Sequence, residues 1–288
     1  NDKVKLNGSY FFNNSRTKNL SRIEKWYEYP SPVDTMEQEG YSNTLNMNHR
    51  LNVRLDWNIN KNMSLMSRTN FSFQGNDPYS FSNGEQWGES GTKLLESGST
   101  GNSQAYRFSE FLQYRLKLGK NGRFLTADAR INHRDNNNES RSFSTQQTLV
   151  DEATGKHYPL LRHLSNLSDS ENTGVSASFN YTEPLGKTTQ LSLRYNFNYN
   201  TSKSIRETTN YGDDDTYTNG VIDNLLSNRF QSDNTRHNIG PRFNWNKGGN
   251  VLVLSLEYQH STLNGFIQSS KDVNVKRDYN DFTYFLMG

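Results

Sequence analysis

The chain of 288 residues has no cysteine, only six prolines and no long apolar run. The missing cysteines exclude a disulfide scaffold, a thiolate zinc site and a cysteine nucleophile. Hydrophobic residues make up 31% of the chain and the mean hydropathy is -0.97, and no segment approaches the roughly 20 apolar residues of a membrane-spanning helix. These absences exclude a helical membrane protein and leave few apolar side chains for a compact soluble core.

The chain also lacks a large excess of either basic or acidic residues. The chain has 32 basic and 30 acidic residues, so its formal net charge is +2. Its basic residues are scattered singly along predicted strands, and no basic stripe for nucleic acid emerges. Aromatic residues, in contrast, are plentiful at 12% of the chain.

Strict alternation of apolar and polar residues is the strongest pattern in the chain. Between Asn46 and Asn58 the odd positions are Met47, His49, Leu51, Val53, Leu55 and Trp57, and the even positions are polar or charged. Side chains alternate across a β-strand, so such a strand has one face suited to hydrocarbon and one suited to water. The pattern predicts a half-exposed strand.

The same pattern predicts about ten strands along the chain. They cover residues 3-14, 46-59, 63-75, 104-118, 124-135, 173-182, 189-201, 234-246, 251-263 and 281-288. Most are long enough for the 9 to 11 residues that a tilted strand needs to cross a bilayer, whereas soluble strands usually have about 5 or 6.

The predicted connections fall into two alternating kinds. Tight turns are expected at 60-62, 119-123, 183-188 and 247-250, and long loops at about 15-45, 76-103, 136-172, 202-233 and 264-280. In outer-membrane barrels short turns lie in the periplasm and long loops outside the cell. We therefore predict an all-β fold, a transmembrane antiparallel up-and-down β-barrel in which neighbours in sequence are neighbours in space.

Aromatic residues near the tight turns support this orientation. Trp57, Tyr181 and Trp245 each lie close before a predicted turn, and amphipathic rings favour the membrane interface. Tyr195 and Phe197 continue the apolar side of their strand toward the opposite interface. We expect these five residues to face lipid or to form the aromatic girdles.

Several strand sequences resemble the barrel portion of TonB-dependent receptors, in particular the Asn- and Tyr-rich outer-membrane barrels of the Bacteroidota type. The resemblance rests on residues 50-57, 191-197, 254-259 and 279-286, and covers the whole chain at the level of pattern. It implies a barrel of about 22 strands closed around an N-terminal plug. Residues 1-288 are then expected to be a partial outer-membrane β-barrel domain without plug or signal peptide, an open curved sheet with two unpaired edges.

The resemblance also implies a function. Such a receptor takes up a scarce solute across the outer membrane of a Gram-negative bacterium, and the periplasmic TonB protein supplies energy through the plug. Its expected partners are outer-membrane lipid, lipopolysaccharide and a surface lipoprotein, with no nucleic acid. Two alternatives stay open: a non-transporting outer-membrane barrel, adhesin-like or for assembly, and a secreted sugar-binding β-sandwich.

No catalytic, cofactor or metal site is predicted. The carboxylates of Asp213, Asp214 and Asp215 superficially resemble a calcium loop, but the ligand spacing fails at Tyr217 and Leu226. None of the six histidines forms a spaced ligand pair, and His133 and His260 lie near strand ends, where an imidazole suits the interface. Serine, histidine and aspartate occur without a nucleophile elbow or a paired-carboxylate signature, so no enzyme is indicated.

Aromatic residues in the first two predicted loops are candidate ligand contacts. They are Trp26, Tyr27 and Tyr29 in the first loop, and Tyr79 and Trp87 in the second. Exposed rings can stack on a sugar or anchor a peptide, because they offer large contact area at low entropy cost. The alternative is that these rings pack the loops against one another.

Overall fold

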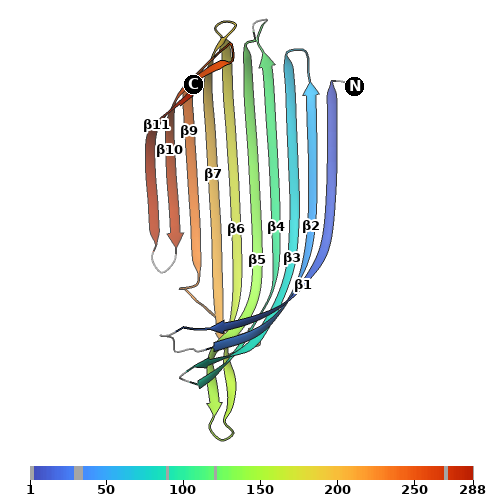
Figure 1. Ribbon diagram of the computed structural model, residues 1–288, viewed down its shortest axis with the longest axis vertical. Helices are drawn as coiled ribbons and strands as arrows, with labels where there is room; N and C mark the ends of the chain where they lie inside the picture. The colour runs from blue at the N-terminus through green and yellow to red at the C-terminus, as the bar shows by residue number, and fades with distance from the viewer. Residues whose placement is uncertain (1–2, 29–34, 89–90, 120–121, 269–271, 288) are drawn as a thin grey trace.

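The computed structural model describes residues 3-28, 35-88, 91-119, 122-268 and 272-287, which form one antiparallel sheet of 11 strands. Ten long strands follow one another in chain order across the sheet, and the short β8 pairs with β7 (Figure 1). The prediction of an antiparallel meander is confirmed. The described residues contain no helix long and apolar enough to cross a membrane.

Most strands are far longer than those of ordinary soluble sheets. They are β1 Val4–Trp26, β2 Thr35–Asn58, β3 Met63–Gly88, β4 Gly91–Lys117, β5 Phe124–Asp151, β6 Lys156–Pro184, β7 Thr189–Gly212, β8 Val221–Ile222, β9 Asn228–Lys247, β10 Asn250–Gln268 and β11 Val273–Met287.

The four tight turns lie where the sequence predicts them, at one end of the sheet. They connect β2 to β3, β4 to β5, β6 to β7 and β9 to β10. Glycines adopt positive φ in two of them, with φ of 79° at Gly119 and 62° at Gly248. A side chain disfavours this left-handed conformation, so glycine suits these positions.

The prediction of long loops at the opposite end is wrong, because most of those residues continue the strands. β3 extends to Gly88 and β4 begins at Gly91, so most of 76-103 is sheet; β6, with 29 residues, takes up much of 136-172. The pattern failed here because apolar and polar residues do not alternate in these extensions. On β3, Asp77 and Asn83 share a face with Phe81, and on β6 the neighbours Leu160 and Leu161 lie on opposite faces.

Serine pairs illustrate how the extensions of β3 and β4 are held together. The Oγ atoms of Ser80 and Ser99 are 2.9 Å apart, and those of Ser82 and Ser97 are 2.7 Å apart. Each pair is directly opposite in the register. Short hydroxyl side chains thus bond across strands while the backbone ladder continues.

The short strand β8 was not predicted from the sequence. It pairs with Thr209 and Asn210 of β7, and β9 pairs with the same strand only from Arg206 downward. The intervening residues 223-227 bulge out between these two pairings, where the Asp223 carboxylate accepts a hydrogen bond from Arg162 at 2.9 Å.

The sheet has one layer and almost no core. Val253 is the single buried apolar side chain among the described residues, while Phe282 and Tyr284 are 72% and 87% exposed. Within these residues β1 pairs only with β2 and β11 only with β10, so the sheet is open at both edges, as predicted. No second sheet of described residues covers it, whereas a β-sandwich has two sheets packed face to face.

The corrected strand lengths can be tested in a chain that lacks cysteine. The double substitution Ser80→Cys with Ser99→Cys should form a disulfide under mild oxidation, because the two side chains face each other with their oxygens 2.9 Å apart. Non-reducing mass spectrometry of tryptic peptides detects the link. Ser80→Cys with Ser103→Cys, about 14 Å out of register, is the control. Equal linkage in both pairs would show that this region is a loop.

Candidate functional site

The inter-strand register sorts the side chains of all ten long strands onto two faces. Leu51 of β2 lies opposite Phe71 of β3, and Phe71 lies opposite Phe108 of β4. Their neighbours Arg50, Ser72 and Arg107 follow one another in the same way on the other side. We call these the band face and the polar face.

The band face carries a belt of apolar side chains next to the tight turns. The alternation in the sequence also predicts lipid contact for the apolar residues of three strands, and all of these lie on the band face: Leu51, Val53, Leu55, Trp57, Leu191, Leu193, Tyr195, Phe197, Leu252, Leu254 and Leu256. On most strands the belt covers about five alternating positions, or about nine residues. Such a stretch is about 30 Å long, and a tilt of 35 to 45° reduces its height to roughly 22 to 25 Å.

Polar aromatic groups mark both limits of the belt. Trp57, Tyr181 and Trp245 lie at the limit near the turns, as expected. At the opposite limit lie His49, His133, His237 and His260. Each of the four imidazoles is hydrogen-bonded to a side chain on its own face; His237 Nδ1, for example, is 2.9 Å from the Tyr195 hydroxyl. Phe197 also packs against His237, with ring centroids 5.2 Å apart.

Glu110 of β4 interrupts the belt at its centre, and the sequence reading overlooked it. It lies between Leu112 and Phe108 on the band face. The hydroxyls of Ser67 and Thr69 on β3 donate to its two carboxylate oxygens, at 2.6 and 2.5 Å. The signal in the sequence is a single glutamate, Glu110, at a position of β4 where the alternation calls for an apolar residue.

Three of the five candidate ligand aromatics lie on strands, where the sequence predicts loops. Trp26 is the last residue of β1, Tyr79 and Trp87 belong to β3, and Tyr27 follows β1 directly. Tyr29 lies outside the described residues. Trp26 and Trp87 flank Thr35 in one row of the band face, beyond the histidines, and Tyr79 lies 6.3 Å from Tyr41, ring centroid to ring centroid. Their role as ligand contacts stays a prediction.

The polar face is rich in asparagine, serine and arginine along its full length. Its acidic residues are few on the long strands: Asp56, Asp128, Asp151, Glu257 and Asp281. Its basic residues are Lys5, Lys25, Arg50, Arg54, Arg68, Lys93, Arg107, Arg115, Lys117, Arg130, Arg134, Lys156, Arg162, Arg194, Arg206, Arg236, Arg242 and Arg277. A net charge of +2 therefore conceals a strongly basic face.

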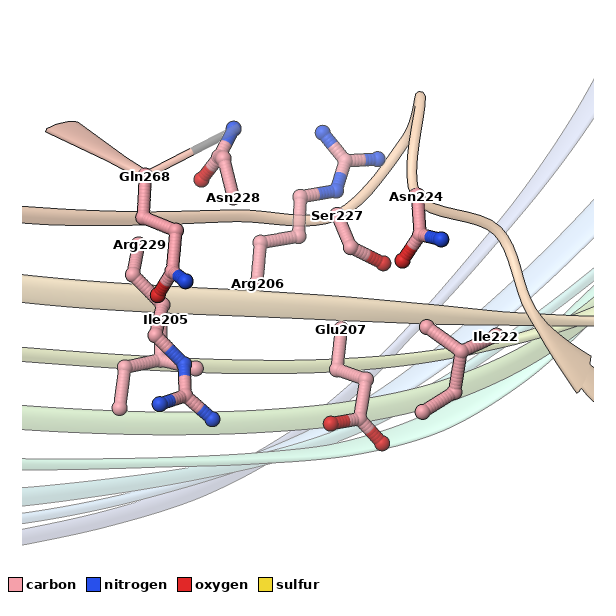
Figure 2. A pocket seen from close by; sticks show the side chains of 9 residues that line it. All are labelled: Ile205, Arg206, Glu207, Ile222, Asn224, Ser227, Asn228, Arg229 and Gln268. Atoms are coloured by element: carbon pink, nitrogen blue, oxygen red, sulfur yellow. The ribbon is translucent and has the colours of Figure 1, made fainter. Parts of the chain in front are cut away.

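The hollows of the surface differ in character. One of about 420 Å³ lies on the polar face across β2, β3 and β4, and Asn48, Arg50, Asn70 and Arg107 are among its lining residues. Another of about 490 Å³ lies where β7 exchanges β8 for β9 (Figure 2). Arg206 and Glu207 point to opposite sides of β7 there. This second hollow is therefore a gap at the irregular junction of β7, β8 and β9, and not a pocket on one face of the sheet.

The three aspartates of the loop after β7 do not converge on a common point. Asp214 accepts hydrogen bonds from the hydroxyl of Thr216 at 2.5 Å and from the backbone N–H of Asn219 at 3.0 Å. These bonds, that of the Thr216 hydroxyl first, lower the pKa of Asp214 below its ordinary value. The described residues contain no group of three or more His, Asp and Glu side chains in metal-binding geometry.

Comparisons with known proteins give distant structural similarity only. No family model matches the chain, and no curated protein matches it. The ferric preacinetobactin receptor BauA of Acinetobacter baumannii aligns with a TM-score of 0.46 and 11% identity over 99% of this chain. The chain spans 44% of the length of that receptor.

Two further solved structures align less well. The outer membrane protease OmpT of Escherichia coli gives a TM-score of 0.26 at 10% identity, over 99% of this chain and 94% of the protease. The outer membrane protein OmpT of Vibrio cholerae gives 0.20 at 10% identity, over 99% and 100%. No residue role is transferred at these scores.

Acid should loosen the loop around Asp214. Because the folded pKa of this carboxyl is depressed, its contribution to loop stability is present above the unfolded pKa of about 3.9 and is lost as the pH falls through the folded pKa. Hydrogen exchange of residues 213-220, corrected for intrinsic rates, measures this. Asp214→Ala should show at neutral pH the fast exchange that the unsubstituted chain shows only in acid. Asp215→Ala should leave exchange unchanged; equal effects would contradict the assignment.

Proposed function

We propose that this sheet is part of the wall of an outer-membrane β-barrel that takes up a scarce solute, in the manner of TonB-dependent receptors. The observation that carries the proposal is the division of the sheet into a band face and a polar face. The belt is about as tall as the apolar band of roughly 25 Å on known outer-membrane barrels, and it has aromatic residues at both limits.

The exposed apolar side chains support a lipid environment. Leu193 is 52% exposed and Leu254 is 42% exposed, and both lie inside the belt. A water-soluble sheet would need a second layer over this face, since a contiguous apolar surface of this size is rare in soluble monomers. A bilayer supplies that cover without any further protein.

The polar face supports transport over the alternatives. Its asparagine, serine and arginine residues continue behind the whole belt, so it suits a wide, water-filled lumen. An adhesin-like or assembly barrel is the second candidate, and the strand extensions beyond the belt, with Trp26 exposed at the end of β1, fit an outside binding role. Lipid, lipopolysaccharide, the TonB protein and a surface lipoprotein are the partners that we propose for the receptor.

Two measurements test the proposal in the full-length protein. First, Leu193→Cys and Asn196→Cys are compared in outer-membrane preparations: a membrane-impermeant maleimide should label Asn196→Cys and spare Leu193→Cys. Second, cells with and without the protein are compared for depletion of dilute small solutes, followed by mass spectrometry, before and after a protonophore. Energy-dependent depletion of a solute supports uptake, and no difference between the cells contradicts it.

Arginine substitutions should separate the two faces energetically. Leu193→Arg should destabilise the membrane-embedded protein by about 2 to 4 kcal/mol, because it places a charge against hydrocarbon. Asn196→Arg, three residues away on the polar face, should be nearly neutral. Reversible urea unfolding in lipid vesicles measures both. A harmless Leu193→Arg with a disruptive Asn196→Arg would show that the faces are assigned the wrong way round.

A further inference from the structure

Six arginines form two parallel rows on the polar face of β2 to β5. The first row places Arg50, Ser72, Arg107 and Arg134 side by side on four neighbouring strands. The second row, four residues nearer the tight turns, places Arg54, Arg68, Phe111 and Arg130 side by side. We call these six arginines the arginine array.

A row of amide and hydroxyl groups lies between the two arginine rows. It consists of Asn52, Asn70, Ser109 and Asn132 on the same four strands. Neighbouring strands are about 4.8 Å apart and a two-residue step is about 6.8 Å, so the array covers a patch of roughly 14 by 14 Å. Every position of the patch except Phe111 offers a hydrogen-bond donor.

The array has too few acidic partners on the sheet. Arg54 is paired with Asp56, its Nε 2.7 Å from Oδ2. Within the part of the chain that the structure describes, Arg50, Arg68, Arg107, Arg130 and Arg134 form no ion pair. Arg130 instead lies over the Phe111 ring, 5.1 Å from its centroid.

Like charges even face each other directly. Arg54 is opposite Arg68, and Arg107 is opposite Arg134. Such pairs destabilise a sheet, so the folded protein gains nothing from them unless an anion is held between them. Guanidinium groups bind carboxylate, phosphate and sulfate through paired N–H donors, which suits them to this task.

We propose that the arginine array is a binding site for a polyanionic solute, one that carries several carboxylate, phosphate or sulfate groups across about 1 nm. This inference rests on the proposed function, because it takes the polar face to line the transport path. It specifies that the scarce solute taken up by the protein is an anion. Arg50 and Arg107 of the array line the hollow of about 420 Å³ on the polar face.

The location of the array distinguishes a solute from a lipid headgroup. Arg50 and Arg54 alternate along β2 with Leu51 and Val53, which belong to the belt on the other face. The array therefore lies at the same height as the belt, on the opposite face of the sheet. A headgroup would meet the band face at the limits of the belt, far from these arginines.

Binding of a defined polyanion tests the proposal. The full-length protein in detergent is titrated with pyrene tetrasulfonate, and fluorescence anisotropy reports binding; a pyrene carrying trimethylammonium groups is the cationic counterpart. The triple variant R50Q, R107Q, R134Q should weaken tetrasulfonate binding by about tenfold or more, since each charge-assisted hydrogen bond contributes on the order of one tenfold step. It should fold at least as well as the parent, because it removes like-charge contacts.

A matched triple variant separates the array from net charge. R16Q, K18Q and K203Q remove the same charge from the band face beyond the belt, and should leave tetrasulfonate binding unchanged. Equal weakening by both triples, or no preference of the parent for the anion over the cation, overturns the proposal.

The last measurement adds anionic lipid vesicles as a competitor for the bound pyrene tetrasulfonate. They should not displace the dye, and displacement that depends on the array would overturn the proposal by showing that these arginines meet lipid. In that case the face assignment behind the proposed function would fail as well. If maleimide labelling confirms the faces while the dye does not bind, the solute is not a polyanion and the proposed function stands.

Discussion

The ladder of backbone hydrogen bonds between neighbouring strands is the interaction on which the rest of this structure depends. A soluble domain is stabilised mainly by its buried apolar side chains, but here Val253 alone is buried among the described apolar residues. The ladder pairs backbone groups over strands of up to 29 residues. It fixes register, and register in turn decides which side chains share a face, so both the apolar belt and the arginine array follow from it.

The belt is almost free of charged side chains. Nearly all charged residues of the long strands lie on the polar face or beyond the limits of the belt. Glu110 is the exception, and its two carboxylate oxygens are both occupied by hydroxyls from Ser67 and Thr69. An unpaired carboxylate costs several kcal/mol in an apolar medium, and two hydroxyl donors offset part of this cost. The three residues thus act as one polar unit within an apolar surface.

The sequence predicted the antiparallel meander of strands, the tight turns and the two faces, because each has a local signal. Alternation around Leu51 and Leu193 identifies the band face, and glycines such as Gly119 and Gly248 mark the turns. The lengths of the strands were not predictable in the same way, because the extensions give no regular period: Leu160 and Leu161 of β6, for example, are neighbours in sequence and lie on opposite faces. The arginine array was hidden for a different reason: its members are spread over 85 residues of sequence, and only the register reveals that Arg107 faces Arg134.

Charge separation between the faces gives the clearest physical argument about what the sheet does. The formal net charge of +2 is small, so nothing in the chain as a whole requires basic residues to collect on one side. Most acidic residues of the strands lie instead on the band face beyond the belt, as Glu37, Glu39 and Asp135 do, where they cannot neutralise the array through the sheet. Five of the six arginines in the array form no ion pair among the described residues, so they keep a positive potential over this part of the polar face. A positive potential raises the local concentration of anions before any contact forms, which is the physical basis of the polyanion site that we propose.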